Sequence, residues 1–434
     1  MLGRCPVCGE WGTYEEEVIN NPKTRSVNGI STISQPQRLQ DISADSATEP
    51  RIPLHNNEFD RVLGGGLVPG SLVLLGGEPG IGKSTLALQV LMQQGERKTL
   101  YATGEESVNQ VRLRASRLDG DPKNLFLVAE TSLENILSQA RDLQPDIVVI
   151  DSIQTIVTGD VEASIGSLTQ VRECAARILQ FAKQTNIPFI LIGHINKEGS
   201  LAGPKVLEHI VDTVLQFEGD HQHLYRILRA QKNRFGSTSE LGIFEMLPTG
   251  LREVTNPSEL LLSTAREGLS GIAIAAAIEG VRPFLIEVQA LVASAAYGTP
   301  QRTSTGFDTR RLSMLLAVLE KRIGFKLLLK DVFLNIAGGL RVNDPAIDLA
   351  VLAAVLSSNM DIPLDPLTAI TGEVGLAGEI RPVPRMEQRI QEAHKLGFTR
   401  MLIPAGQKLD RADYPIELIP VAKVADAFRI LIKK

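Results

Sequence analysis

The sequence predicts an α/β protein whose first folded domain has a mostly parallel β-sheet flanked by helices. Three observations support this fold class. A glycine-rich loop at 77–84 follows a short apolar run at 71–75, and a run with helical spacing follows it at 85–93. Two further apolar runs, at 99–103 and 146–150, are followed by acidic residues. Because the carboxyl ends of strands in an open parallel sheet lie on its ligand side, we expect the loop and these acids at one edge.

The glycine-rich loop fits the pattern G-x-x-x-x-G-K-[ST] at every fixed position. Glycines allow successive backbone N–H groups to converge on a phosphate, and the following helix adds the positive end of its dipole. Lys83 would reach the β- and γ-phosphates, and the Ser84 hydroxyl would join the Mg²⁺ shell. The alternative is a glycine-rich turn with a chance Lys-Ser. The predicted ATP-binding residues of the loop are Gly77, Glu78, Pro79, Gly80, Ile81, Gly82, Lys83, Ser84 and Thr85.

Acidic residues follow the next two predicted strands. Glu105 comes after the strand at 99–103 and is positioned to orient or deprotonate the attacking water, with Glu106 the lesser candidate. The alternative is an acidic capping box, since Ser107 follows and a helix starts near Asn109. Asp151 ends the next apolar strand and would hold Mg²⁺ through water, opposite Ser84.

A further apolar strand at 188–193 ends at His194, where a polar side chain can touch the γ-phosphate and signal its loss to the following loop. A plain histidine at a strand end is the alternative. The loops at 158–166 and 196–205 are rich in small residues, and the second carries two lysines that could follow a sugar-phosphate backbone in a ring channel. Their alternative is a pair of solvated loops.

Two cations stand one residue apart after the strand at 225–229. Lys232 and Arg234 would point to the same face of a strand. There they could reach the phosphates of a neighbouring subunit, as an arginine finger does. The alternative is a pair of surface cations on a hairpin.

Length and composition limit the class of protein. The chain has 434 residues, 43% of them hydrophobic and 22% charged, as in soluble globular proteins of about three domains. The longest apolar runs are too short to span a membrane, and no secretion signal opens the sequence, so we expect a cytoplasmic protein. Three cysteines make no disulfide framework. The net charge of −5 argues against a globally basic nucleic-acid coat.

The sequence divides into three predicted regions. Residues 1–50 hold a truncated zinc-finger half and a linker, residues 51–255 the nucleotide-binding domain, and residues 256–434 a second domain. Cys5 and Cys8 form the tight turn of a zinc knuckle, but a structural zinc site needs four ligands and the second pair is missing. The half-site therefore either binds no metal or takes ligands from elsewhere.

In their order, the glycine loop, Glu105, Asp151 and the pentapeptide Lys-Asn-Arg-Phe-Gly at 232–236 closely resemble the bacterial RadA (Sms) family, over essentially the whole chain. This resemblance implies a RecA-like P-loop ATPase core, related to the hexameric replicative helicases. It further implies ATP-driven, helicase-like movement on single-stranded and branched DNA, branch migration of recombination intermediates, a homo-hexameric ring and a RecA-type recombinase as partner. The family normally carries a four-cysteine zinc finger; here only the second pair and a partly disordered remnant are expected.

The region from 256 onward is similar to the proteolytic domain of Lon, an α+β fold. Where Lon has its serine and lysine, this sequence has Ala346 and Glu387, neither of which can replace that pair. We expect a relic without peptidase activity that serves as an assembly or DNA-binding platform. Its candidate phosphate contacts, which could equally be solvated helix cations, are Arg302, Arg310, Arg311 and Lys321.

Two other functions remain open. An ATP-dependent protease of the Lon type is disfavoured by the missing serine and lysine, and casein cleavage would revive it. A signalling or timing ATPase, like the clock ATPases that share the entry sequence Asp-Arg-Val-Leu-Gly-Gly-Gly at 60–66, is disfavoured by the pentapeptide and the Lon-like region.

Overall fold

The computed structural model describes residue 38 and residues 51–194, 205–219, 225–263, 268–295, 300–327, 329–339, 341–409 and 414–432. The predicted zinc half-site at Cys5 and Cys8 lies outside these residues, as does most of the lysine-containing loop at 196–205. Within the described ranges, no helix is long and apolar enough to cross a membrane.

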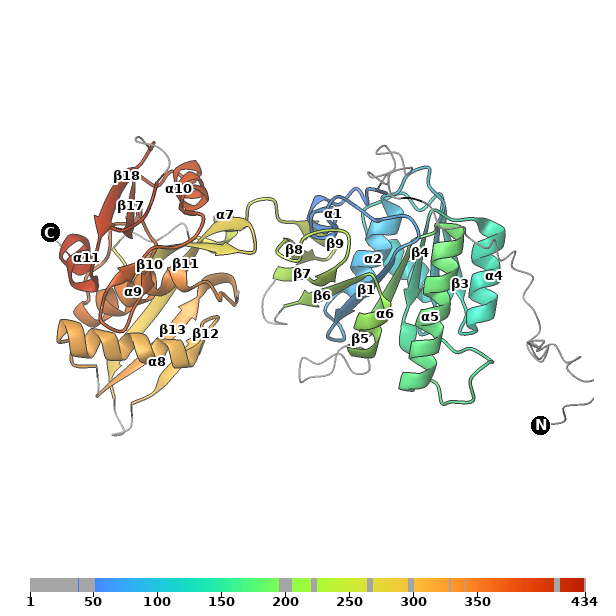
Figure 1. The fold of residues 1–434 in the computed structure, drawn as a ribbon, viewed down its shortest axis with the longest axis horizontal. Helices are drawn as coiled ribbons and strands as arrows, with labels where there is room; N and C mark the ends of the chain where they lie inside the picture. The colour runs from blue at the N-terminus through green and yellow to red at the C-terminus, as the bar shows by residue number, and fades with distance from the viewer. Residues whose placement is uncertain are drawn as a thin grey trace, which may run out of the picture. The chain divides into compact units, whose positions relative to one another are not determined.

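The first sheet has nine strands within the described residues, in the order β3-β2-β4-β5-β1-β6-β7-β8-β9 (Figure 1). The strands from β3 to β6 in this order are parallel, and the last three are antiparallel. Their bounds are β1 Leu72–Gly77, β2 Thr99–Thr103, β3 Leu125–Ala129, β4 Ile147–Asp151, β5 Phe189–His194, β6 Thr213–Glu218, β7 Tyr225–Asn233, β8 Leu241–Leu247 and β9 Gly250–Glu253.

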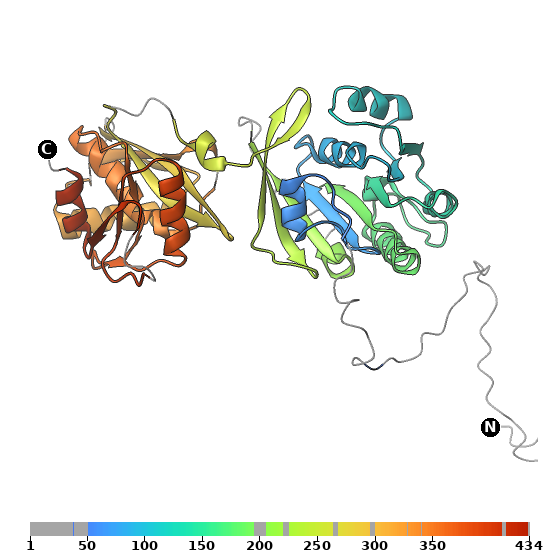
Figure 2. The same cartoon turned by 90° about the horizontal axis from the view of Figure 1, so that it is seen from above.

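Helices cover both faces of this sheet (Figure 2). One face packs against α1 (Asn57–Leu63), α2 (Lys83–Met92) and α3 (Val108–Ala115). The other packs against α4 (Leu133–Leu143), α5 (Leu168–Thr185) and α6 (Lys205–Ile210). Alternate residues of β1 enter the two cores, Val73 and Leu75 on one side, Leu72 and Leu74 on the other. Burial on both faces explains why this strand is a continuous apolar run.

Strand register brings the predicted site to one edge. Gly77, where the glycine loop begins, pairs with His194 across β1 and β5. Asp151 pairs with Ile192 on β5 and with Thr103 at the end of β2. Because all four strands are parallel, the glycine loop, Glu105, Asp151 and His194 all lie at the carboxyl edge, as the sequence predicted.

A second sheet of seven strands, within the described residues, has the order β12-β13-β11-β10-β14-β17-β18. The strand pair predicted at 271–280 and 283–292 is confirmed as the antiparallel β10 (Ile272–Glu279) and β11 (Arg282–Ser294). The remaining strands are β12 Arg302–Thr305, β13 Lys330–Ile336, β14 Thr368–Ile370, β17 Arg400–Pro404 and β18 Glu417–Val421, with a separate hairpin of β15 Glu373–Val374 and β16 Ile380–Arg381. The helices are α7 Pro257–Leu261, α8 Thr309–Val318, α9 Asp348–Met360, α10 Met386–Lys395 and α11 Val424–Leu431.

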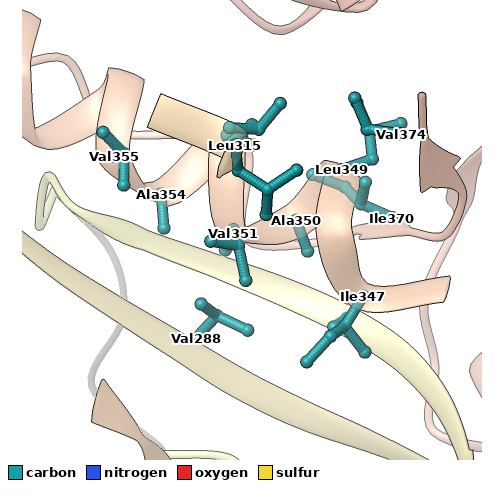
Figure 3. Packing of buried hydrophobic residues seen from close by; sticks show 14 of the residues in the cluster. Val288, Leu315, Ile347, Leu349, Ala350, Val351, Ala354, Val355, Ile370 and Val374 are labelled. Atoms are coloured by element: carbon teal, nitrogen blue, oxygen red, sulfur yellow. The ribbon is translucent and has the colours of Figure 1, made fainter. Parts of the chain in front are cut away.

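The core of this second region is built around α9 (Figure 3). Residues 349–356 of this helix are all apolar and buried, so this part of it is apolar around its whole circumference and not along one stripe. Val351 and Ala354 lie toward Val288 of β11, and Leu315 of α8 packs in the same cluster. Since the two sheets use separate ranges of the chain, the arrangement agrees with an α/β core followed by an α+β region. The exact boundary at 255/256 stays a prediction.

Candidate active site

The glycine loop turns sharply between β1 and α2. Gly80 and Gly82 have φ of 77° and 112°, in the left-handed region that favours glycine. A Cβ on Gly82 would also come within 2.7 Å of Met246 Cε. No side chain caps the first turn of α2, so the N–H groups at this helix end are available to an anion. The loop therefore has the geometry of a phosphate site.

Lys83 lies inside this loop and is only 3% exposed. Its Nζ donates to the carbonyls of Gly77 and Glu78, both at 2.8 Å. Burial lowers the pKa of Lys83 to about 8, against the opposing effect of the nearby carboxylates of Asp151, Glu105 and Glu78. In this state two carbonyls hold the ammonium, and bound phosphate oxygens would compete for it.

Asp151 ends β4 as a buried carboxylate, and a hydroxyl holds it in place. The phenol of Tyr101, itself fully buried on β2, donates to Asp151 Oδ2. Burial, followed by the charge of Asp151, raises the pKa of Tyr101 well above its ordinary value, so the phenol stays a donor. Ser84 Oγ and Asp151 are hard oxygen donors of the kind Mg²⁺ takes when phosphates and waters complete its shell, so these residues fit that ion. Among the described residues, no cluster of three or more histidine, cysteine or acidic side chains could hold a metal alone.

Glu105 stands at the centre of a small polar network. Its Oε1 accepts a hydrogen bond from Ser152 Oγ at 2.5 Å and lies 3.3 Å from His194 Nε2. Its backbone N–H donates to Thr103 Oγ1 at 3.3 Å. The side chain is 41% exposed, so it reaches the surface where a nucleotide would lie. Glu105 has the position and the access that a general base requires.

The acidic capping box, the alternative considered for this pair, does not form. The N-cap of α3 is Ser107, and its reciprocal partner is Gln110. Glu106 instead pairs with Arg114. Glu106 is thus neutralised by a neighbour, while Glu105 faces the site, in the order of preference that the sequence suggested.

His194 lies beside the glycine loop and is about one third exposed. Its Nε2 faces Glu105, and its Nδ1 is buried with no hydrogen-bond partner within the described part of the chain. The residues following it, which would carry a signal away from the phosphate, are outside the described part of the chain. Its sensor role stays a prediction.

Lys232 and Arg234 do not lie near this site. Lys232 belongs to β7, but Arg234 lies one residue beyond the end of that strand. Contrary to expectation, the two cations are therefore not in one strand. Lys232 Nζ donates to the carbonyls of Glu208 and Val211, at 2.6 and 2.7 Å. Arg234 lies 3.4 Å from the buried Asp212. Both cations therefore contact the segment that leads from α6 into β6.

Backbone hydrogen bonds show at which end of the strands Arg234 lies. Arg234 N donates to the carbonyl of Asp212, and Asp212 N donates to that of Leu72, the first residue of β1. Gly77, at the last residue of β1, is five positions further, or about 17 Å at the rise of a strand. Arg234 is consequently level with the opposite edge of the sheet from the glycine loop of its own chain.

A built scaffold supports the turn at 234–236. Asn233 Oδ1 accepts from Phe235 N at 3.0 Å, and its Nδ2 donates to Leu63 O at 3.2 Å. Arg51 donates to Phe235 O at 2.5 Å and to Leu63 O at 2.9 Å. The turn is therefore fixed against the end of α1 by two side chains, those of Asn233 and Arg51, from distant parts of the chain.

The first candidate channel loop, at 158–166, is held to α5 from within. Gln170 Nε2 donates to the carbonyls of Thr158, Val161 and Ala163, and its Oε1 accepts from Thr158 N. Ile165 is 70% exposed on this loop. The loop is thus anchored at one side while presenting an apolar side chain outward.

In the second region, Ala346 and Glu387 are where the sequence comparison with Lon would place a serine and a lysine. Ala346 is fully buried, and Glu387 accepts a hydrogen bond from Tyr414 at 2.8 Å. Between β10 and α10, the buried Arg389 pairs with Asp344 at 2.8 Å and donates to Ala276 O at 2.6 Å. Neither predicted position supplies a nucleophile.

One of the four predicted phosphate contacts in this region is already paired. Arg311 makes a two-pronged contact with the buried Asp348, while 31% of its side chain stays exposed; its role as a phosphate contact stays a prediction. Arg302 is half-buried on β12, while Arg310 and Lys321 are exposed around α8. Exposure is compatible with phosphate binding and does not establish it.

Comparisons with known proteins add to this geometry. Residues 36–200 match a family model described as AAA domain, and residues 298–407 one described as subunit ChlI of Mg-chelatase. The chain is 49% identical to the DNA repair protein RadA of Bacillus subtilis, covering 99% of this chain and 94% of that protein. It is 48% identical to the DNA repair protein RadA of Listeria monocytogenes, at the same coverage. Among solved structures, a KaiC-like protein of Pyrococcus horikoshii aligns at 23% identity and a TM-score of 0.40, over 47% of this chain and 98% of its own.

Proposed function

The chain belongs to the RadA family of DNA repair proteins, and from this membership we propose that it is a DNA-dependent ATPase that moves on single-stranded and branched DNA as a homo-hexameric ring. The movement promotes branch migration of recombination intermediates in the cytoplasm, with a RecA-type recombinase as partner. This proposal extends the family's role in DNA repair to a specific motor activity.

The main support for the proposal is the distance between the glycine loop and Arg234 along one sheet. The glycine loop with Lys83 lies at the carboxyl edge, whereas Arg234 is level with the first residue of β1. An arginine side chain cannot cover the intervening ~17 Å of strand. If Arg234 serves a phosphate, that phosphate belongs to a neighbouring copy. Head-to-tail contacts of this kind generate rings when the rotation closes.

Each interface between neighbouring subunits, called a seam below, would bring the following residues together around one nucleotide. The N–H groups at the start of α2 and the ammonium of Lys83 hold the phosphates. Glu105 takes the proton of the attacking water through the oxygen that Ser152 and His194 leave available. Ser84 and Asp151 would hold Mg²⁺, which neutralises charge on the phosphates when bound. Arg234, with Lys232, would stabilise the transferring phosphoryl group from the neighbouring copy.

A subunit-mixing experiment tests this arrangement. Lys83→Ala and Arg234→Ala proteins are each expected to lose DNA-stimulated ATP hydrolysis. When the two are mixed after dissociation and reassembly, a seam is complete wherever an intact glycine loop meets an intact Arg234. Random mixing in equal amounts gives about one quarter complete seams in a head-to-tail ring. The measurement is ATP turnover per subunit with single-stranded DNA.

Recovery of activity in the mixture supports the shared seam. A mixture that stays inactive, although both variants assemble and bind nucleotide, contradicts it. The matched control mixes Lys83→Ala with a Lys83→Ala, Arg234→Ala double variant, which cannot form a complete seam. In a strand-exchange assay, Lys83→Ala is also expected to abolish branch extension.

For the second region we propose a folded relic without peptidase activity that serves as a platform for assembly or DNA. The proposal is supported by the buried methyl group of Ala346 and by the engagement of Glu387 with Tyr414. Casein cleavage by the pure protein would contradict it. The zinc half-site at Cys5 and Cys8 stays a prediction, testable by metal analysis of the purified chain.

A further inference from the structure

Ser152 is a buried hydroxyl at the carboxyl edge of the sheet. It follows Asp151 directly and precedes the short helical turn Ile153–Thr155. Its side chain is 0% exposed, and its Oγ donates to Glu105 Oε1 at 2.5 Å. This buried serine thus donates its only hydroxyl hydrogen to the side chain of the candidate base.

The hydrogen bond matters because Glu105 has little else to fix its direction. Its carboxylate is partly exposed, and a free glutamate side chain would populate several rotamers. Oε1 is held between Ser152 Oγ and His194 Nε2, at 2.5 and 3.3 Å. With one oxygen held, the other is directed by the covalent geometry of the carboxylate.

A shorter, better-placed hydrogen bond is expected to dominate this orientation. The contact to Ser152 is shorter by 0.8 Å than the one to His194. Ser152 is also rigid, because it is buried and its carbonyl accepts from Thr155 N at 3.1 Å and from Thr155 Oγ1 at 2.8 Å. The side chain of His194, by contrast, is 35% exposed. Ser152 is therefore the firmer of the two supports.

We propose that Ser152 is a positioning residue for ATP hydrolysis: it holds Oε1 of Glu105 so that Oε2 faces the attacking water. This inference rests on the proposed role of Glu105 as the base. Ser152 itself is not expected to touch the nucleotide, since its hydroxyl is committed to Glu105. Its loss should lower the rate of the chemical step and leave nucleotide affinity unchanged.

A double-mutant cycle tests the inference in the full-length chain. The proteins are wild type, Ser152→Ala, Glu105→Gln and the double variant, each with Mg-ATP and single-stranded DNA. Single-turnover hydrolysis gives the chemical rate, and fluorescence titration with labelled nucleotide gives affinity. Ser152→Ala is expected to lower the chemical rate roughly tenfold, with unchanged affinity. In the Glu105→Gln background, removing Ser152 is expected to have no further effect.

Ser71→Ala is the matched control. Ser71 is also a buried serine, but it directly precedes β1, and its Oγ has no hydrogen-bond partner among the described residues. Its loss should leave the hydrolysis rate unchanged, which separates loss of a buried hydroxyl from loss of the contact to Glu105. Ser152→Cys keeps a side chain of similar size, but its thiol is a weaker hydrogen-bond donor. It takes the place of Ser152→Ala in the comparison with Ser71→Ala if the alanine variant is unstable.

The outcomes are distinguishable. An unchanged or faster rate for Ser152→Ala overturns the inference, as does an equal loss in both backgrounds, because Ser152 would then act through another group. A wild-type rate for Glu105→Gln would instead remove Glu105 as the base, which is a failure of the proposed function. A weakened nucleotide affinity with an unchanged chemical rate would show that Ser152 supports the binding loop and not the base.

Discussion

Raising the pH should weaken nucleotide binding through one group, Lys83. The burial of its ammonium within the glycine loop lowers its pKa to about 8. A bound phosphate is an opposite charge within contact distance and favours the protonated lysine, so the pKa must be higher in the complex. The sign follows from this difference: affinity is constant while the empty site stays protonated, and falls as the pH rises above about 8.

The size of the effect follows from the fraction of protonated sites. At pH 9, one unit above a pKa of about 8, about one tenth of empty sites carry the charge. Nucleotide affinity should then be about tenfold weaker than at pH 7, and should fall about tenfold for each further unit until the pKa of the complex is reached.

The assay is fluorescence anisotropy of a labelled nucleotide from pH 7.5 to 9.5, without Mg²⁺, so that the Lys83 term dominates. Lys83→Met cannot titrate, and should bind weakly with a flat profile over this range. A flat profile in the wild type would refute the reasoning. So would a break near pH 8 that survives in Lys83→Met, because another group would then be responsible.

Two further predictions concern side chains that the structure places in buried pairs. Tyr101→Phe deletes the donor that holds the Asp151 carboxylate in place and should raise the Mg²⁺ concentration for half-maximal ATP hydrolysis about tenfold, since loss of a hydrogen bond that orients a metal-ligating side chain typically costs about 10–100-fold in metal affinity; an unchanged Mg²⁺ titration would contradict this. Arg389→Met leaves the carboxylate of Asp344 buried without its partner and should lower the free energy of unfolding by about 3–5 kcal/mol in denaturant titration. Adding Asp344→Asn should recover part of the loss, and no recovery would show that packing, not charge, is responsible.

Much of the site could be predicted because motif position and strand order are local features of the sequence. Gly77–Ser84, Glu105, Asp151 and His194 each follow an apolar run that reads as a buried strand. Once the strands are parallel, their carboxyl ends meet without further information. That step needs no knowledge of which strands are neighbours, and it held at all four positions.

The supporting residues could not be predicted, because their partners are distant in the chain. Ser152 reads as an ordinary residue after a strand, and its contact with Glu105 spans 47 positions. Tyr101 could have been noticed as the one phenol in a buried strand, but its contact with Asp151 spans 50 positions. The ion pair of Arg311 could not be predicted for the same reason, because Asp348, its buried partner, lies 37 residues away. The position of a residue after a predicted strand indicates which edge of the sheet it reaches. Whether a charged side chain is paired depends on residues that are distant in the sequence.

Arg51 couples the turn at 234–236 to the end of α1. Its guanidinium group donates to the carbonyl of Phe235 and to that of Leu63, the last residue of α1. Because one guanidinium group holds both backbone segments, a displacement of the end of α1 would be transmitted to the turn that carries Arg234.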